Sequence, residues 1–172
     1  QRLGYRHLGL DLTRSALGEA AAHGLAAAVR ADVMTVPLAD GVADVVCAGE
    51  ILEHVTDLPR AVAEACRILK PGGLLVIDTL ADTTLCALLT VRIAERIPGG
   101  APKGIHDPAL FVDRDELRRL ASEHGVPLQL NGIRPSLINL VRWFSRRTEE
   151  MTLVTTRSTA VLFQAHGRKL VA

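Results

Sequence analysis

The sequence predicts an α/β fold built around a mostly parallel β-sheet. Short runs of aliphatic and β-branched residues alternate with helical stretches, which is typical of strands joined by crossover helices. The chain has 172 residues and is 48% hydrophobic, which is enough for one domain with a substantial core. Because no repeat or low-complexity linker divides it, we expect a single domain over residues 1–172.

The first predicted strand, residues 6–11, ends at Asp11, and an alanine-rich helix follows from Thr13 to about Ala28. A second short strand covers residues 29–32. The nearly continuous apolar run over residues 43–48 indicates a strand buried on both faces.

The next helix begins at Asp57, with Pro59 in its first turn, because an aspartate accepts hydrogen bonds from the first free N–H groups. Lys70–Gly73 is expected to end this helix before a strand over 74–78. The remaining predictions are helices over 82–97, 113–124 and 136–147, strands over 126–133 and 156–165, and a loop over 98–107.

Composition excludes some functions and favours others. The net charge of +1 gives no field that attracts nucleic acid. Three widely spaced cysteines form no disulfide framework and no cysteine zinc site, which favours a reducing compartment such as the cytoplasm. We expect Cys47 and Cys66 to be core residues. No apolar run approaches the roughly 20 residues of a membrane helix.

Two aspartates follow predicted strands. Asp11 can accept both hydroxyls of a ribose, as in nucleotide-binding βαβ units, or it can simply cap the following helix. Asp32 together with the N–H of Val33 can read an adenine edge, or Asp32 can be a loop residue.

The segment after the third strand carries Glu50, Glu53 and His54, which share one face if they form a helical turn. Two carboxylates and an imidazole can hold a divalent cation such as magnesium. The alternative is that Glu53 and His54 only orient the loop by hydrogen bonds.

His106 lies in a loop rich in glycine and proline after the fourth strand. Ligands of open α/β sheets bind beyond the carboxyl ends of the strands, so His106, oriented by Asp107, is a candidate general base. The alternative is a solvated surface histidine.

The helix over 82–97 is unusually apolar. It is either a lid or core helix, or a patch that touches a membrane or a lipid-like substrate.

Taken in order, several strings resemble the class I S-adenosylmethionine-dependent methyltransferases: Gly9-Leu-Asp11, Asp32 with Pro37-Leu-Ala-Asp40, Ala43-Asp-Val-Val-Cys47, Leu52-Glu-His-Val-Thr-Asp57 and Leu69-Lys-Pro-Gly-Gly73. Further strings resemble the ubiquinone-biosynthesis O-methyltransferases: Glu50–His54, Asp78-Thr-Leu80, and Pro102–Asp107 followed by Phe111. This similarity covers about residues 9–120.

The resemblance implies a Rossmann-like fold whose last strand is antiparallel, and an enzyme that methylates a phenolic or catechol-like small molecule such as a quinol precursor. Cofactor contacts would come from Asp11 with Leu12, Asp32 with Val33, and the backbone of Gly49. Glu50, Glu53 and His54 match the family's magnesium ligands, and the helix over 82–97 would favour peripheral membrane contact.

The glycine-rich loop that holds the methionine end of the cofactor in this family is absent from the sequence, which contains no Gly-x-Gly. We therefore expect the domain to lack its N-terminal strand and helix. Two other functions stay open: methylation of another small molecule, such as a natural product, and a non-catalytic Rossmann-like binding module.

Overall fold

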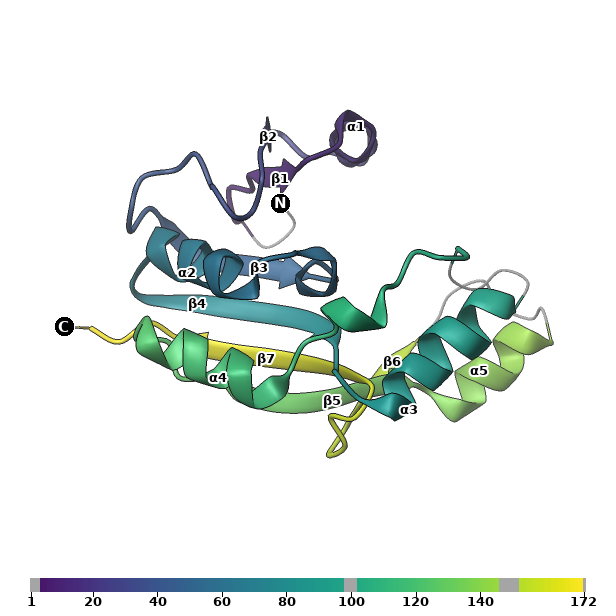
Figure 1. The fold of residues 1–172 in the computed structure, drawn as a ribbon. Coiled ribbons are helices and arrows are strands. Elements are labelled where there is room, and N and C mark those ends of the chain that lie inside the picture. The colour runs from purple at the N-terminus through teal and green to yellow at the C-terminus, as the bar shows by residue number, and fades with distance from the viewer. Residues whose placement is uncertain (1–3, 98–101, 146–151, 172) are drawn as a thin grey trace.

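The computed structural model describes residues 4–97, 102–145 and 152–171, and these residues form two separate sheets (Figure 1). The small sheet pairs β1 (Gly9–Asp11) with β2 (Ala28–Arg30) in parallel, and α1 (Arg14–Ala22) connects them. The five-stranded sheet has the order β3-β4-β7-β5-β6. Its strands are β3 (Ala43–Gly49), β4 (Leu69–Leu80), β5 (Gln129–Pro135), β6 (Leu153–Thr156) and β7 (Leu162–Arg168).

The strand directions confirm the predicted α/β class. β3 and β4 are parallel, and β7 is antiparallel to both of its neighbours, β4 and β5. β3, β4 and β5 therefore run the same way, and the late strand β7 runs against them. β6 adds an antiparallel edge beside β5.

Two boundaries differ from the prediction. Lys70–Gly73 does not separate helix from strand, because β4 already begins at Leu69 and includes this segment. The backbone at Gly73 lies close to the backbone of Lys70 and of Ala43. Only glycine permits this, since a Cβ at this position would lie 2.9 and 3.2 Å from their carbonyl oxygens. The predicted strand over 156–165 is in fact the end of β6, a turn, and the start of β7.

The α1 helix is shorter than predicted, because it ends at Ala22 and not near Ala28. Gly24 follows with φ at +94°, a left-handed conformation that glycine adopts easily and that ends helices. The alanine-rich composition predicted a longer helix, but Gly24 ends α1 soon after Ala22.

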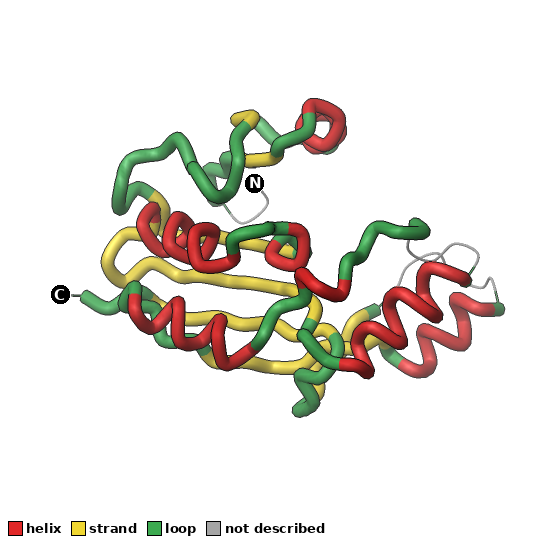
Figure 2. Tube along the Cα trace, in the orientation of Figure 1, coloured by secondary structure: helices red, strands yellow, loops and turns green. Residues whose placement is uncertain are grey.

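Two helices cover one face of the large sheet. α2 (Leu58–Ile68) and α4 (Arg114–Glu123) lie side by side in front of the strands, as Figure 2 shows. Each begins as predicted: Asp57 accepts a hydrogen bond from Arg60 N, and Asp113 accepts from the N–H groups of Asp115 and Glu116.

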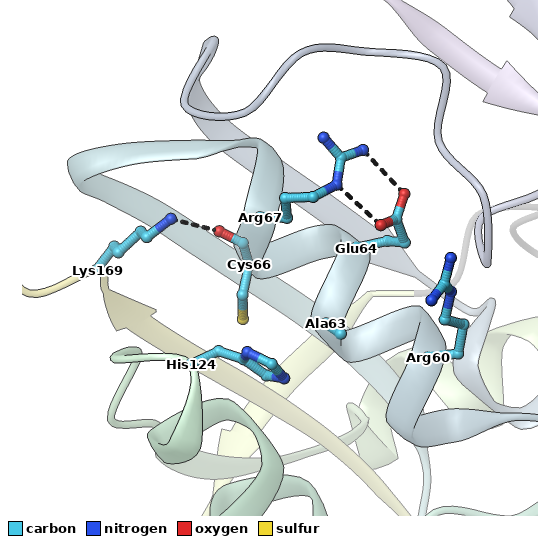
Figure 3. A pocket seen from close by; sticks show the side chains of 7 residues that line it. All are labelled: Arg60, Ala63, Glu64, Cys66, Arg67, His124 and Lys169. Carbon is cyan, nitrogen blue, oxygen red and sulfur yellow. Dashed lines mark hydrogen bonds and ion pairs between the residues drawn. The ribbon is translucent and has the colours of Figure 1, made fainter.

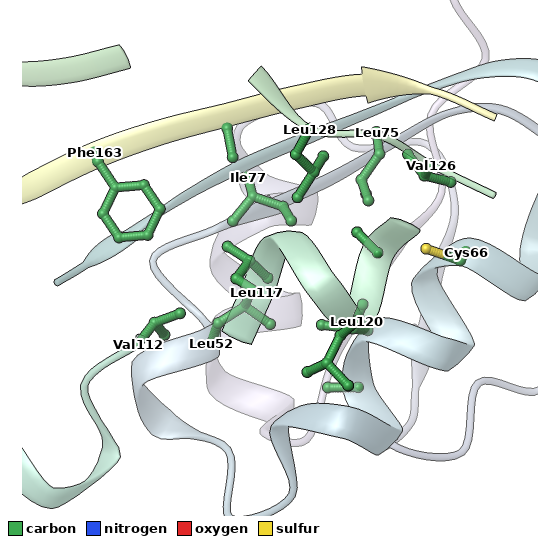
Figure 4. Close-up of a cluster of buried hydrophobic side chains, with 14 of the residues drawn as sticks. Leu52, Cys66, Leu75, Ile77, Val112, Leu117, Leu120, Val126, Leu128 and Phe163 are labelled. Atoms are coloured by element: carbon green, nitrogen blue, oxygen red, sulfur yellow. The ribbon is translucent and has the colours of Figure 1, made fainter. Parts of the chain in front are cut away.

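The core lies between these helices and the sheet (Figure 4). Leu75 and Ile77 of β4, Phe163 of β7 and Leu117 of α4 are all at most 2% exposed. Alternate residues of β4 point to the other face and are only half-buried. Cys47 pairs with Val76 on that face and is exposed, so its predicted core position is wrong, whereas Cys66 is buried as predicted.

A second helical layer extends beyond one end of the sheet. The predicted helix over 82–97 consists of α3 (Thr84–Ala87), a π-helical stretch η2 (Leu88–Ile93) and a 3₁₀ turn η3 (Ala94–Arg96). α5 (Leu137–Phe144) lies beside it (Figure 1). The predicted end of α5, residues 146–147, and the first part of the loop over 98–107 lie outside the described residues.

Within the described ranges, β3 is an edge strand, and the small sheet forms no hydrogen-bonded pair with it. No helix in the described part of the chain is long and apolar enough to cross a membrane.

Candidate active site

The candidate site is built where β3 and β4 end. Gly49 closes β3 opposite Asp78, and Glu50 N donates to the carbonyl oxygen of Asp78 at 2.9 Å. Glu50 has φ at +49°, a left-handed conformation that is uncommon for a residue with a side chain. A 3₁₀ turn, η1 (Leu52–His54), follows at once, and buried Leu52 anchors it in the core.

Glu53, the middle residue of this turn, is a fully buried carboxylate. Its Oε2 accepts a hydrogen bond from Thr79 Oγ1 of β4 at 2.7 Å, while its buried Oε1 faces no donor in the described part of the chain. An unpaired buried oxygen is costly, so a proton donor or a cation near Oε1 would be stabilised.

Glu50 is the neighbouring residue that can provide a proton donor for Oε1 of Glu53. Burial of its carboxyl raises the pKa of Glu50 to about 7, with further contributions from the negative charges of Glu53 and Asp78. A protonated Glu50 would supply the donor that Oε1 of Glu53 lacks. Asp78 is held separately, since its Oδ1 accepts from Gln164 Nε2 at 2.7 Å.

His106 lies beside η1. Its ring stacks on that of His54, with centroids 6.0 Å apart, and meets the edge of Phe111 at 6.4 Å. Its Nδ1 lies 3.1 Å from Oε1 of Glu95, and only 15% of the side chain is exposed. His106 is thus a fixed, largely buried imidazole and not the solvated histidine of the alternative interpretation.

Asp107 does not orient His106, contrary to the prediction. Its Oδ1 accepts from Ala109 N at 3.0 Å and so caps the 3₁₀ turn η4 (Pro108–Leu110). A side chain that caps the next turn points along the chain and away from the preceding ring. Glu95, which comes from η3, takes the orienting position.

The predicted metal ligands are not gathered into a set. In the ranges that the structure covers, no three His, Cys, Asp or Glu side chains are placed to hold a metal ion. The unpaired oxygen of Glu53 would be stabilised by a nearby cation. However, His54 is stacked on His106 and does not converge with Glu50 and Glu53. The observed contact of Glu53 with Thr79 agrees with the alternative, in which Glu53 orients the loop.

The predicted adenosine contacts lie at the carboxyl ends of β1 and β2, with Asp11 as the last residue of β1 and the others in the loops that follow. Asp11 Oδ1 accepts from the N–H and hydroxyl of Thr13 at 2.6 and 2.7 Å, and these bonds lower the pKa of Asp11. Leu12 is 57% exposed. Asp32 accepts from Met34 N at 2.8 Å, and Val33 packs against the core. Each carboxylate is thus bound by its own loop, and their roles toward a cofactor stay predictions.

The arrows of β1 and β3 point the same way in Figure 1, so Asp11 and Gly49 both lie at the carboxyl ends of their strands. That is the edge where ligands of open α/β sheets bind. The structure therefore places the predicted cofactor residues and the predicted base toward one side of the molecule.

The sequence analysis assigned no individual role to three contributors: Asp78, Thr79 and Glu95. Asp78 and Thr79 belong to a string that carries the family resemblance, but nothing local in the sequence indicates that Thr79 meets Glu53. A signal existed for Glu95, which is the one carboxylate within the apolar stretch 83–97.

A pocket of about 390 Å³ lies at the opposite end of the sheet and contains none of these residues (Figure 3). It lies between α2 and the end of α4, where Lys169 Nζ donates to the carbonyl oxygens of Cys66 and Leu69. Arg67 in its wall is paired with Glu64 and Asp40. The cationic side chains of Lys169 and Arg67 are therefore engaged in contacts that stabilise the local fold.

Comparison with known proteins matches residues 1–77 to a family model described as a methyltransferase domain. The ubiquinone biosynthesis O-methyltransferase of Thiobacillus denitrificans is 35% identical over 159 residues, which are 88% of this chain and 68% of that protein. The protein of the same name from Burkholderia pseudomallei is 36% identical over 138 residues, which are 76% of this chain. The chain spans only 60% of that relative's length.

Among solved structures, a SAM-dependent methyltransferase from Thermotoga maritima superimposes with a TM-score of 0.68 at 20% sequence identity. The match covers 94% of this chain and 72% of that one. At this identity the likeness concerns the fold alone, and it confirms the predicted Rossmann-like architecture.

Proposed function

The chain belongs to the S-adenosylmethionine-dependent methyltransferase family that includes the ubiquinone biosynthesis O-methyltransferases, and from this premise we propose that the full-length protein transfers a methyl group to a hydroxyl of a phenolic or catechol-like small molecule. One observation in the chain supports this most strongly. A largely buried imidazole, His106, is held by a carboxylate on the side of the molecule where the predicted cofactor contacts lie. An imidazole held in this way can act as a general base.

The cofactor would bring a methyl group that is already electrophilic, because it is attached to a sulfonium. The protein's tasks are then to position the acceptor and to take its proton. In this proposal Asp11 and Leu12 contact the ribose, Asp32 and Val33 contact the adenine, and Gly49 approaches the cofactor through its backbone. His106 accepts the hydroxyl proton at the ring nitrogen that does not face Glu95.

Methyl transfer to oxygen is tested directly by product analysis. The full-length protein is incubated with methyl-labelled S-adenosylmethionine and a panel of catechols, simple phenols and amines, and the products are identified by mass spectrometry. The proposal expects label on a catechol or phenol oxygen. Label only on amines, or none on any acceptor in the panel, would contradict it.

The same assay, repeated after exhaustive chelation, tests the magnesium prediction. The structure gathers no ligand set from the described residues, so the proposal routes no step through a metal. Activity that survives chelation agrees with proton removal by His106 alone. Activity that disappears and returns with magnesium would assign that task to a cation near Glu50 and Glu53.

We further propose that residues 82–97 contact an anionic lipid surface, as a quinol-type acceptor with a lipid tail would require. Leu88, Leu89 and Ile93 are between 38 and 47% exposed on this segment. On neighbouring α5, Leu137 and Ile138 are 66 and 71% exposed. Arg92, Arg96 and Arg142 are exposed on the same two segments and would favour anionic headgroups.

Replacing Leu88, Leu89 and Ile93 together by serine should weaken vesicle binding by at least about tenfold, because each buried aliphatic side chain contributes roughly 1.5–3 kcal/mol. Flotation with vesicles of phosphatidylcholine and phosphatidylglycerol measures the bound fraction. Val171→Ser is the matched control, since Val171 is 76% exposed far along the chain from this segment. Equal flotation of the triple variant and the control would rule out this contact surface.

A further inference from the structure

We propose that Glu95 is a positioning residue, which orients His106 and fixes the ring nitrogen that carries the proton. This inference rests on the proposed function, because it gives Glu95 a role in the proton removal assigned to His106. It starts from an unusual placement. Glu95 is 7% exposed, although its neighbour Arg96 and the preceding Arg92 and Ile93 are exposed.

A buried carboxylate is costly unless hydrogen bonds satisfy its oxygens. Both oxygens of Glu95 are satisfied by the segment 104–106. Oε2 accepts from Gly104 N at 2.8 Å, and Oε1 accepts from His106 N at 3.2 Å. The Gly104 N–H contributes most to lowering the pKa of Glu95, so the side chain remains ionised.

The third contact determines the state of the imidazole. Oε1 of Glu95 lies 3.1 Å from Nδ1 of His106. An ionised carboxylate can only accept hydrogen bonds, so Nδ1 must carry a proton and donate it. In a neutral imidazole the other nitrogen, Nε2, then holds a free lone pair. Glu95 thus fixes Nε2 as the nitrogen that can accept a proton from a substrate.

The ring has little freedom to rotate out of this arrangement. His54 stacks on one side of it, and the edge of Phe111 lies against it. The ring plane and its protonation are therefore defined by three contacts from three separate elements. His54 belongs to η1, Glu95 belongs to η3, and Phe111 follows η4. A side chain that served only to fold the 104–106 loop would need the backbone contacts but not the contact with Nδ1.

The decisive variant is Glu95→Gln, which keeps the size of the side chain and removes its charge. A glutamine has one oxygen and one NH₂ group, so it cannot accept from both Gly104 and His106 as the carboxylate does. Where its oxygen keeps the Gly104 contact, its NH₂ group faces Nδ1, and the imidazole then carries its proton on Nε2, where it cannot act as a base. In a well-studied catalytic triad, the corresponding Asp→Asn change lowers kcat by roughly 10⁴ through the wrong tautomer.

We expect Glu95→Gln to lower kcat by about 10² to 10⁴ with an unchanged KM for the methyl donor. Glu95→Asp should recover part of the rate, since it restores the charge with a shorter reach. Glu19→Gln, which removes a charge from an exposed position on α1, is the matched control and should keep the wild-type rate. Equal kcat for Glu95→Gln and the control would overturn the inference.

A double-variant test separates this role from a direct one. If Glu95 acts through His106, adding Glu95→Gln to His106→Ala should cause no further loss of kcat. A second loss as large as the first would show that Glu95 works independently of His106.

A readout without activity keeps the inference testable if the proposed function is wrong. In protein labelled with ¹⁵N in its histidine rings, NMR at a pH where His106 is neutral should show the proton on Nδ1 in the wild type and on Nε2 in Glu95→Gln. A wild-type ring that carries its proton on Nε2 would overturn the inference. A failed methylation assay with the expected change of tautomer would overturn only the proposed function.

Discussion

His106→Ala should lower kcat for methyl transfer by about 10² to 10⁴, which is the usual contribution of a positioned general base. The imidazole that is lost is held by Glu95 and packed against His54 and Phe111, so water would not take its place in the same geometry. The dissociation constant for S-adenosylmethionine should stay within about threefold of wild type, since the proposed cofactor contacts lie on β1, β2 and β3. Steady-state kinetics and calorimetric titration measure the two quantities.

His124→Ala is the control for this prediction. His124 is an exposed residue that follows α4 and lines the pocket at the opposite end of the sheet, so its loss should leave kcat unchanged. If His106→Ala retains the wild-type kcat, His106 takes no part in the reaction. If it instead weakens cofactor binding in proportion to the loss of rate, His106 is a binding residue.

Phe163→Ala should destabilise the protein by about 3–5 kcal/mol, since it removes a large side chain from the core and leaves a cavity. Phe163 is fully buried on β7, between β4 and β5, and it packs against the helices over the sheet (Figure 4). A typical domain has only about 5–15 kcal/mol of stability, so this variant should unfold at a much lower denaturant concentration. Chemical denaturation followed by circular dichroism measures the change.

Ile138→Ala provides the comparison. Ile138 is 71% exposed on α5, so its truncation should change the free energy of unfolding by no more than about 0.5 kcal/mol. Phe163→Leu, which keeps most of the apolar volume, should lie between the two. A Phe163→Ala protein as stable as Ile138→Ala would mean that β7 does not occupy the centre of the sheet.

The sequence predicted the elements whose signals are local. Asp57 and Asp113 mark the starts of α2 and α4 because the capping hydrogen bond joins residues two or three positions apart. The apolar run over 43–48 was predicted correctly as a strand, β3, but the prediction that it is buried on both faces is wrong, because β3 is an edge strand of the described sheet and none of its residues is fully buried. The family resemblance extended these predictions to the fold, which the comparisons confirm.

Contacts between distant residues could not be predicted in the same way. Thr79 meets Glu53 across 26 positions, and only the parallel pairing of β3 with β4 brings them together. Asp107 was expected to orient His106 because it is adjacent in sequence, but the carboxylate that does so arrives from η3. The exposed position of Cys47 follows from which face of the sheet the helices cover, and composition does not contain that information.

The central claim is that the carboxyl ends of β1, β2 and β3 hold S-adenosylmethionine. Calorimetric titration of the cofactor into the full-length protein and its Asp11→Ala variant tests this most directly. Binding by the wild type should weaken at least about tenfold in the variant, because hydrogen bonds to a charged carboxylate contribute roughly 1.5–3 kcal/mol. Thr13→Ala, which removes the N-cap of α1 but keeps the carboxylate, should bind within about threefold of wild type. A wild-type protein that binds no cofactor, or an Asp11→Ala variant that binds it as tightly as the wild type, would contradict the account.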